Sequence, residues 1–164
     1  MKNKISNYDF LIVGAGLVGS LAAIALFKNN YKVLIVEKNK SINDDKRTLA
    51  VNANSRDFLR EIGLWHKLAN EEEPIEKILI KDSVNKEDLI FQNPDESMGS
   101  VIYNESLLKA ARKYLDYNKL LITGIDLDLQ KISPSSHINI KNKTFYFKKV
   151  IISLGKNFSD IEKI

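Results

Sequence analysis

A glycine-rich turn, Gly14-Ala15-Gly16-Leu17-Val18-Gly19, constrains the fold of this chain more than any other feature. Before it, the nearly continuous apolar run from Tyr8 to Val13 is typical of a strand that is buried on both faces. After it, the segment from Leu17 to Lys28 is rich in alanine and leucine, which indicates a helix. A second apolar run extends from Tyr31 to Glu37. Two buried strands joined by a helix within about thirty residues are expected to be parallel, so the sequence predicts a right-handed βαβ unit.

The glycines of the turn match the pattern G-x-G-x-x-G, and each has a physical task. Gly14 allows a tight turn, Gly16 lets the backbone approach a pyrophosphate, and Gly19 lets the helix pack closely on the strand. The helix N-terminus adds about half a positive elementary charge and unpaired N–H donors. The turn is therefore suited to bind a diphosphate.

Glu37 ends the second strand, about twenty residues after the glycines. A carboxylate at this place accepts hydrogen bonds from ribose hydroxyls and repels the additional phosphate of NADP. The alternative is an ordinary α/β turn followed by a surface glutamate, which the surrounding pattern disfavours. The pattern does not separate NAD from FAD, because both carry an ADP half.

Composition limits the remaining function classes. Of the 164 residues, 44% are hydrophobic and 28% are charged, as in a soluble globular domain. No cysteine is present, which excludes disulfides, thiolate metal sites and cysteine nucleophiles and suits a cytoplasmic protein. The net charge is +4, but the lysines are scattered among acidic residues, so we expect no nucleic-acid partner. The stretch from Leu17 to Phe27 is too short to span a membrane, so any membrane contact would be peripheral.

The rest of the chain predicts an α/β fold with a parallel sheet and a β-meander. A helix is expected from Ser55 to Ile62 and another from Asn104 to Tyr114, with Asn104 as its N-cap. The two histidines, His66 and His137, are expected at the surface. Strands are expected at Ile75–Asp82, Asp88–Phe91, Val101–Tyr103, Leu120–Thr123, Leu127–Ile132, His137–Ile140 and Thr144–Val150, the last continuing into Ile151-Ile152-Ser153.

The segment Arg47-Thr48-Leu49-Ala50 is followed by Asn54-Ser55 and by a helix that closes at Gly63-Leu64-Trp65. This arrangement resembles the aromatic-hydroxylase branch of the FAD-dependent monooxygenases, and more closely the hydroxylases of ubiquinone biosynthesis. In that family the arginine of an Arg-x-x-Ala motif lies against the ribityl and pyrophosphate region of the flavin. The resemblance implies this role for Arg47. The alternative is an ordinary surface arginine in a polar loop.

The likeness continues through Pro74-Ile75 and Asp82 to the segment Met98–Asn104, which resembles the Gly-x-Val-Val-Glu-Asn-x-x-Leu motif of the family. Tyr103 stands where the family usually has glutamate, whereas Asn104 keeps its match and also has a structural explanation as a helix cap. The resemblance also implies a backbone contact of Leu127 with adenine. The resulting set of expected cofactor-binding residues is Gly14, Ala15, Gly16, Leu17, Val18, Gly19, Glu37, Lys38, Arg47, Thr48, Asn104 and Leu127, with no catalytic and no metal-binding residue.

The sequence departs from the family near its end. The family has Gly-Ala-Asp-Gly-x-x-Ser after a strand, whereas here Gly155 replaces the aspartate and Lys156 the second glycine. Family members continue beyond the position of Ile164 with a substrate-covering sheet and a second FAD motif. The resemblance therefore implies a Rossmann-like FAD-binding domain of the glutathione-reductase type over residues 1–164, incomplete relative to the family.

The implied activity is FAD-dependent hydroxylation of a polyprenylated phenol in ubiquinone biosynthesis, with NAD(P)H as electron donor in the complete enzyme. Such an enzyme would work in the cytoplasm or at the inner face of a membrane, with other ubiquinone-biosynthesis proteins as potential partners. Two alternatives stay open. One is a non-catalytic fragment that binds FAD or ADP, and the other is an NAD-dependent oxidoreductase domain, which Arg47 and the meander disfavour.

Overall fold

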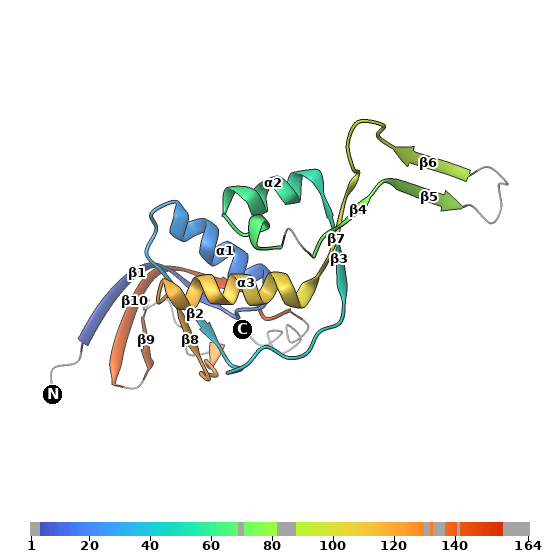
Figure 1. Cartoon of the computed structure of the whole chain (residues 1–164). Coiled ribbons are helices and arrows are strands. Elements are labelled where there is room, and N and C mark those ends of the chain that lie inside the picture. The colour runs from blue at the N-terminus through green and yellow to red at the C-terminus, as the bar shows by residue number, and fades with distance from the viewer. Residues whose placement is uncertain are drawn as a thin grey trace. The chain divides into compact units, whose positions relative to one another are not determined.

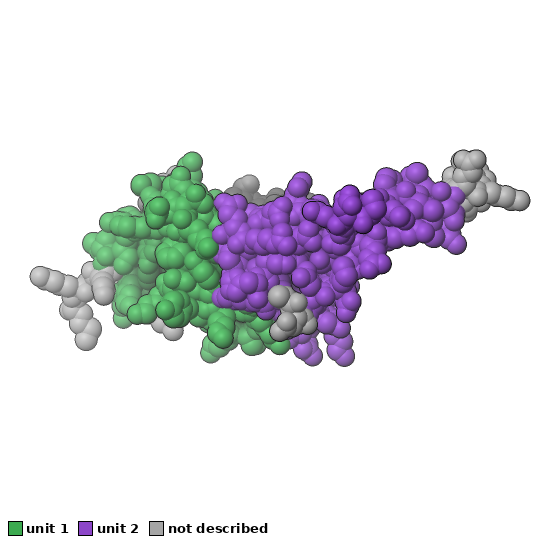
Figure 2. Space-filling model, turned by 45° about the horizontal axis from the view of Figure 1, so that its top comes forward, with its two compact units in different colours: residues 1–43, 108–164 green, residues 44–107 purple. Residues whose placement is uncertain are grey.

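The computed structural model describes residues 4–68, 71–81, 88–129, 132, 137–140 and 142–155. The chain divides into two compact units, which Figure 2 colours separately. Unit 1 comprises residues 1–43 and 108–164, and unit 2 comprises residues 44–107. None of the helices in the described residues is long and apolar enough to cross a membrane.

Unit 1 contains a five-stranded sheet with the order β8-β2-β1-β10-β9 (Figure 1). The pairs β8–β2, β2–β1 and β1–β10 are parallel, whereas the pair β10–β9 is antiparallel. The elements of unit 1 are β1 (Lys4–Val13), α1 (Leu17–Lys28), β2 (Val33–Glu37), β8 (Leu121–Thr123), β9 (His137–Ile140) and β10 (Lys143–Ile152).

The predicted βαβ unit is confirmed by β1, α1 and β2. All five residues of β2 are buried, and Leu11, Ile12 and Ile35 are 0% exposed. The two strands differ from the prediction at their starts, because β1 begins at Lys4 and β2 at Val33 rather than Tyr31. The continuous apolar runs therefore mark the buried centre of the sheet.

The meander is only partly as predicted. Strands β9 and β10 form its hairpin, and β10 also pairs parallel with β1 over most of its length. The expected strand Leu127–Ile132 is wrong over its described residues, since 127–129 are not in a strand. Leu127 and Leu129 alternate with acidic residues because they pack against the core cluster of the sheet, not because they pair with a neighbouring strand.

Unit 2 contains a three-stranded antiparallel sheet with the order β3-β7-β4 and a separate hairpin of β5 and β6. The strand expected at Ile75–Asp82 is divided into β4 and β5, and Asp82 lies outside the described residues. Strand β3 was not predicted. The elements of unit 2 are β3 (Thr48–Asn52), α2 (Ala53–Glu61), the 3-10 helix η1 (Trp65–Lys67), β4 (Glu73–Ile75), β5 (Lys77–Lys81), β6 (Asp88–Gln92) and β7 (Gly99–Tyr103).

Helix α3 (Asn104–Tyr117) begins in unit 2, and its residues from Leu108 onward belong to unit 1. The predicted N-cap role of Asn104 differs from the structure, in which Asn104 is the first helical residue. Its side-chain amide instead donates a hydrogen bond to Asp45. The N-cap of α2 is clear, because the Asn52 side chain accepts a hydrogen bond from the Ser55 N–H at 2.8 Å.

The β5–β6 hairpin carries an unusual apolar surface. Six large side chains on two strands are each between 41% and 54% exposed. A two-stranded hairpin is marginally stable in water without a third strand or a packed face, and contiguous apolar patches often mark interaction surfaces. The six residues are Ile78, Leu79, Ile80, Leu89, Ile90 and Phe91.

Candidate nucleotide-binding site

A pocket of about 710 Å³ lies in unit 1 at the carboxyl ends of β1, β2 and β10. Ligands of open α/β sheets bind at this edge. The pocket brings together most of the residues expected in this unit. Those that line it are Gly14, Gly16, Leu17, Val18, Glu37, Lys38 and Leu127, and Gly155 lines it as well.

Two glycines of the turn are required by the fold itself. Gly14 has a φ of +96°, and a Cβ there would lie 2.3 Å from the carbonyl oxygen of Ser153. A Cβ on Gly19 would lie 2.1 Å from the carbonyl oxygen of Gly14. The close packing of helix on strand that the motif predicts is therefore present, and neither position accepts a side chain without backbone movement.

Gly16 differs from the other two glycines. A Cβ built on it meets nothing within 4 Å, and its φ of −64° suits any residue. Packing inside the protein therefore does not explain this glycine. An open space beside its backbone at the pocket wall fits the expected approach of a pyrophosphate.

The N-terminus of α1 faces the pocket through Leu17 and Val18. Its N-cap is Gly16, which supplies no side-chain hydrogen bond, and the first turn holds no acidic residue. The first N–H groups of the helix thus have no side-chain cap, and the helix dipole adds a positive potential. This combination favours an anionic group.

Glu37 is 9% exposed, and both oxygens of its carboxylate bind the backbone around the pocket. Oε2 accepts a hydrogen bond from the N–H of Ala15 at 2.7 Å, and Oε1 accepts one from the N–H of Asn39 at 2.9 Å. A carboxylate offers about four acceptor sites, so these bonds leave capacity for a ribose hydroxyl. Glu37 therefore also fixes the glycine turn, a task that its position in the sequence did not indicate.

Arg112, which sequence reasoning missed, contacts both the glycine turn and Glu37. It lies on α3, is 9% exposed, and donates from Nε to the carbonyl oxygen of Ala15 at 2.9 Å. Its Nη2 lies 3.5 Å from Oε2 of Glu37. Burial lowers the pKa of the Arg112 guanidinium, and the charges of Glu37 and Asp116 oppose this effect. The available signal was an arginine beside the buried positions Ala111 and Leu115 of a helix.

The surroundings of three further residues of unit 1 are defined by their contacts. Ser20 is fully buried and donates to the carbonyl oxygen of Ala15 at 3.1 Å, which makes it a packing residue of the crowded helix. Lys38 Nζ lies 2.8 Å from Asp126 Oδ2, and both side chains are exposed. Leu127 is half-buried and packs against the core of the sheet.

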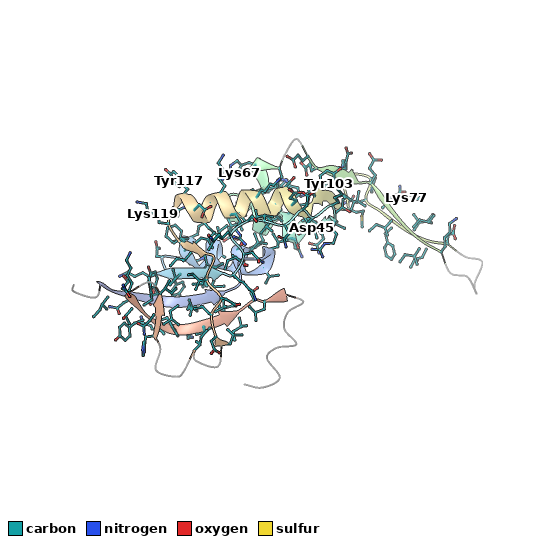
Figure 3. All side chains as sticks on the ribbon, turned by 90° about the horizontal axis from the view of Figure 1, so that it is seen from below. Asp45, Lys67, Lys77, Tyr103, Tyr117 and Lys119 are labelled. Atoms are coloured by element: carbon teal, nitrogen blue, oxygen red, sulfur yellow. The ribbon has the colours of Figure 1, made fainter. Side chains whose placement is uncertain are left out.

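The other expected residues lie together in unit 2. Arg47 donates from Nε and Nη2 to the two carboxylate oxygens of Asp45, at 2.8 Å and 2.6 Å. Thr48 and Tyr103 form the last pair of the β3–β7 ladder, and Tyr103 is 54% exposed. Figure 3 labels Asp45. The Arg47 guanidinium holds the pKa of the Asp45 carboxyl well below the usual range. Sequence reasoning missed Asp45.

The two histidines lie outside the pocket lining. His66 is exposed, and His137 packs against Tyr146 with ring centroids 5.4 Å apart. No group of metal ligands occurs among the residues that the structure describes. The departure from the family motif at Lys156 lies outside them.

Comparison with known proteins agrees with this geometry. The family model of the FAD binding domain matches residues 7–131. Kynurenine 3-monooxygenase of Anopheles gambiae is 32% identical over 131 residues, which cover 71% of this chain and 27% of that protein. Ubiquinone hydroxylase UbiM of Neisseria meningitidis is 22% identical, with 94% of this chain and 37% of that protein covered.

Solved structures share the fold. The flavin-dependent monooxygenase PieE, in complex with FAD and substrate, has a TM-score of 0.68 at 15% identity, with 94% of this chain and 32% of that chain covered. The p-nitrophenol 4-monooxygenase PnpA of Pseudomonas putida has a TM-score of 0.67 at 16% identity, with 97% and 44% covered. The chain thus spans between 27% and 44% of the length of these proteins. Because the family model matches most of its residues, the chain belongs to the FAD binding domain family, with the Rossmann-like fold found in the N-terminal part of FAD-dependent monooxygenases.

Proposed function

We propose that this chain binds FAD and forms the cofactor-binding part of an FAD-dependent monooxygenase. The observation that carries the proposal is the pocket at the strand ends, where the open side of Gly16 meets the uncapped N-terminus of α1. Both features are unexplained by packing and suit the diphosphate of a dinucleotide.

In this proposal the backbone of Gly14, Gly16, Leu17 and Val18 binds the diphosphate, while Ala15 and Gly19 keep the turn in shape. Glu37 accepts hydrogen bonds from the adenosine ribose. Lys38 and Leu127, which line the same pocket, are proposed to contact the adenine end of the cofactor. Arg47, Thr48 and Asn104 bind the ribityl side of the cofactor, as the resemblance implies. When bound, the flavin supplies the redox chemistry, and the protein supplies binding, orientation and exclusion of water.

For the whole protein we propose hydroxylation of an aromatic ring with NAD(P)H as electron donor. A polyprenylated phenol of ubiquinone biosynthesis is the proposed substrate, which would place the protein at the inner face of a membrane. Two relatives support this choice by name, UbiM and the mitochondrial ubiquinone biosynthesis monooxygenase COQ6 of Dictyostelium discoideum. The kynurenine monooxygenase relative makes an aromatic amino acid the competing substrate class.

A second candidate is a module that binds FAD without catalysing hydroxylation by itself. The exposed apolar surface of the β5–β6 hairpin favours it, because such a surface would be covered by further polypeptide in an active enzyme. The relatives carry roughly two thirds of their length beyond the matched region, and that part would be the covering polypeptide. Under this candidate the chain binds FAD but does not couple NAD(P)H oxidation to hydroxylation.

The test is a calorimetric titration of the purified chain with FAD, NAD and NADP, together with an absorbance spectrum of the reconstituted protein. We expect one FAD per chain and a flavin absorbance band, with ADP competing for the site. NADP should bind much more weakly, because Glu37 repels its additional phosphate. A colourless protein that cannot be reconstituted with FAD would refute the proposal. NADPH oxidation coupled to ring hydroxylation by the chain alone would exclude the second candidate.

A further inference from the structure

Asp45 is the shared hydrogen-bond partner of Arg47 and Asn104. Its Oδ1 and Oδ2 accept the two side-chain hydrogen bonds of Arg47, at 2.8 Å and 2.6 Å. Oδ2 also accepts a hydrogen bond from the side-chain amide of Asn104, which lies 59 residues further along the chain. One carboxylate therefore orients both side chains.

The backbone supports this cluster from two sides. The N–H of Arg47 donates to Oδ1 of Asp45 at 3.1 Å. The N–H of Asn104 donates to the carbonyl oxygen of Arg47 at 3.0 Å, directly beyond the last pair of the β3–β7 ladder, Thr48 and Tyr103. The cluster therefore lies next to the paired ends of β3 and β7.

The Arg47–Asp45 ion pair contributes little to stability, because its guanidinium is exposed. The side chain of Arg47 is 71% exposed and that of Asp45 is 19% exposed. Exposed ion pairs contribute little to the free energy of folding. A bidentate arginine–carboxylate pair does, however, fix the plane and direction of the guanidinium.

We propose that Asp45 is a positioning residue for cofactor binding, which holds the Arg47 guanidinium and the Asn104 amide in one fixed arrangement before the ligand arrives. This inference rests on the proposed binding of FAD and on the part of Arg47 in it. Ordering a free arginine side chain during binding weakens affinity by about three- to tenfold. Asp45 removes this cost, because the side chain is already ordered.

The experiment compares FAD affinity in a double-mutant cycle of Asp45→Asn and Arg47→Met. We expect D45N to weaken FAD binding by about three- to tenfold without changing the unfolding midpoint, and to have a smaller effect in the R47M background, where only the Asn104 amide is left to position. Asp44→Asn is the matched control, since it removes the same charge one residue away, and its FAD affinity should equal that of the wild type. Asp45→Glu should retain part of the affinity that D45N loses.

A second readout does not need FAD. In the wild type the Nε–H of Arg47 should give an NMR signal that is protected from exchange with solvent, and D45N should remove this protection while D44N retains it. Equal FAD affinity of D45N and wild type, or an equal loss in the R47M background, would overturn the inference alone. A wild-type chain that binds no FAD would overturn the proposed function and this inference together.

Discussion

Replacement of Arg112 by methionine removes the cation that ties α3 to the glycine turn. The charged hydrogen bond from Nε to the Ala15 carbonyl is lost, as is the contact of Nη2 with Glu37 at 3.5 Å. Removing one partner of a buried pair costs about 3–5 kcal/mol, because the other charge stays buried without compensation. Glu37 keeps its two backbone N–H donors and the Ala15 carbonyl keeps the Ser20 hydroxyl. We therefore expect the lower end, about 3 kcal/mol.

Urea unfolding followed by far-UV circular dichroism measures this loss. With a typical urea slope of about 2 kcal/mol per molar, R112M should lower the unfolding midpoint by about 1.5 M. The control is Arg60→Met, which breaks an exposed pair with Asp57 and should change the free energy of unfolding by less than about 0.5 kcal/mol. The double variant with Glu37→Gln and R112M should lose less free energy of unfolding than the two single variants lose in sum. A loss in R112M no larger than that in R60M would show that the contacts of Arg112 do not stabilise the fold.

Two other predictions concern packing and pH. Gly19→Ala places a methyl 2.1 Å from the Gly14 carbonyl oxygen, so it should destabilise the fold by about 2 kcal/mol in the same assay; wild-type stability would contradict the close packing. Asp9 accepts hydrogen bonds from Lys148 Nζ and the Lys32 N–H, which lower the pKa of its carboxyl below its usual value. A lowered pKa stabilises the fold above the unfolded value, and this contribution is lost as pH falls toward the folded value. Asp9→Asn should therefore be less destabilised than wild type by a change from about pH 5 to pH 3, and urea midpoints with identical pH dependence would contradict the assignment.

The sequence predicted best what depends on local pattern. The βαβ unit followed from two continuous apolar runs and the glycine turn, because burial on both faces leaves a direct trace in composition. Strand β3 was not predicted because four of its five residues are exposed or half-buried. The strand expected from Leu127 was wrong because alternation also arises where a loop packs its leucines on a core.

The missed site residues are those whose roles depend on distant contacts. Arg112 acts on Ala15, which lies 97 residues away, and Asp45 meets Asn104 across 59 residues. Neither residue stands in a recognisable motif, and the buried helix positions beside Arg112 indicate its burial but not its partners. Glu37 was predicted for its ribose contact, and its second role in fixing the turn became visible only through its bonds to Ala15 and Asn39.

A diphosphate site at the glycine turn is best tested by comparing the FAD affinity of the wild type with that of Gly16→Ala. The methyl group meets nothing within 4 Å in the protein, so the variant should unfold at the same urea concentration as the wild type. It would, however, occupy the space through which the backbone approaches the diphosphate. We expect the wild type to bind one FAD, and fully folded G16A to bind it at least about tenfold more weakly. No FAD binding by the wild type, or equal binding by both proteins, would contradict a diphosphate site at this turn.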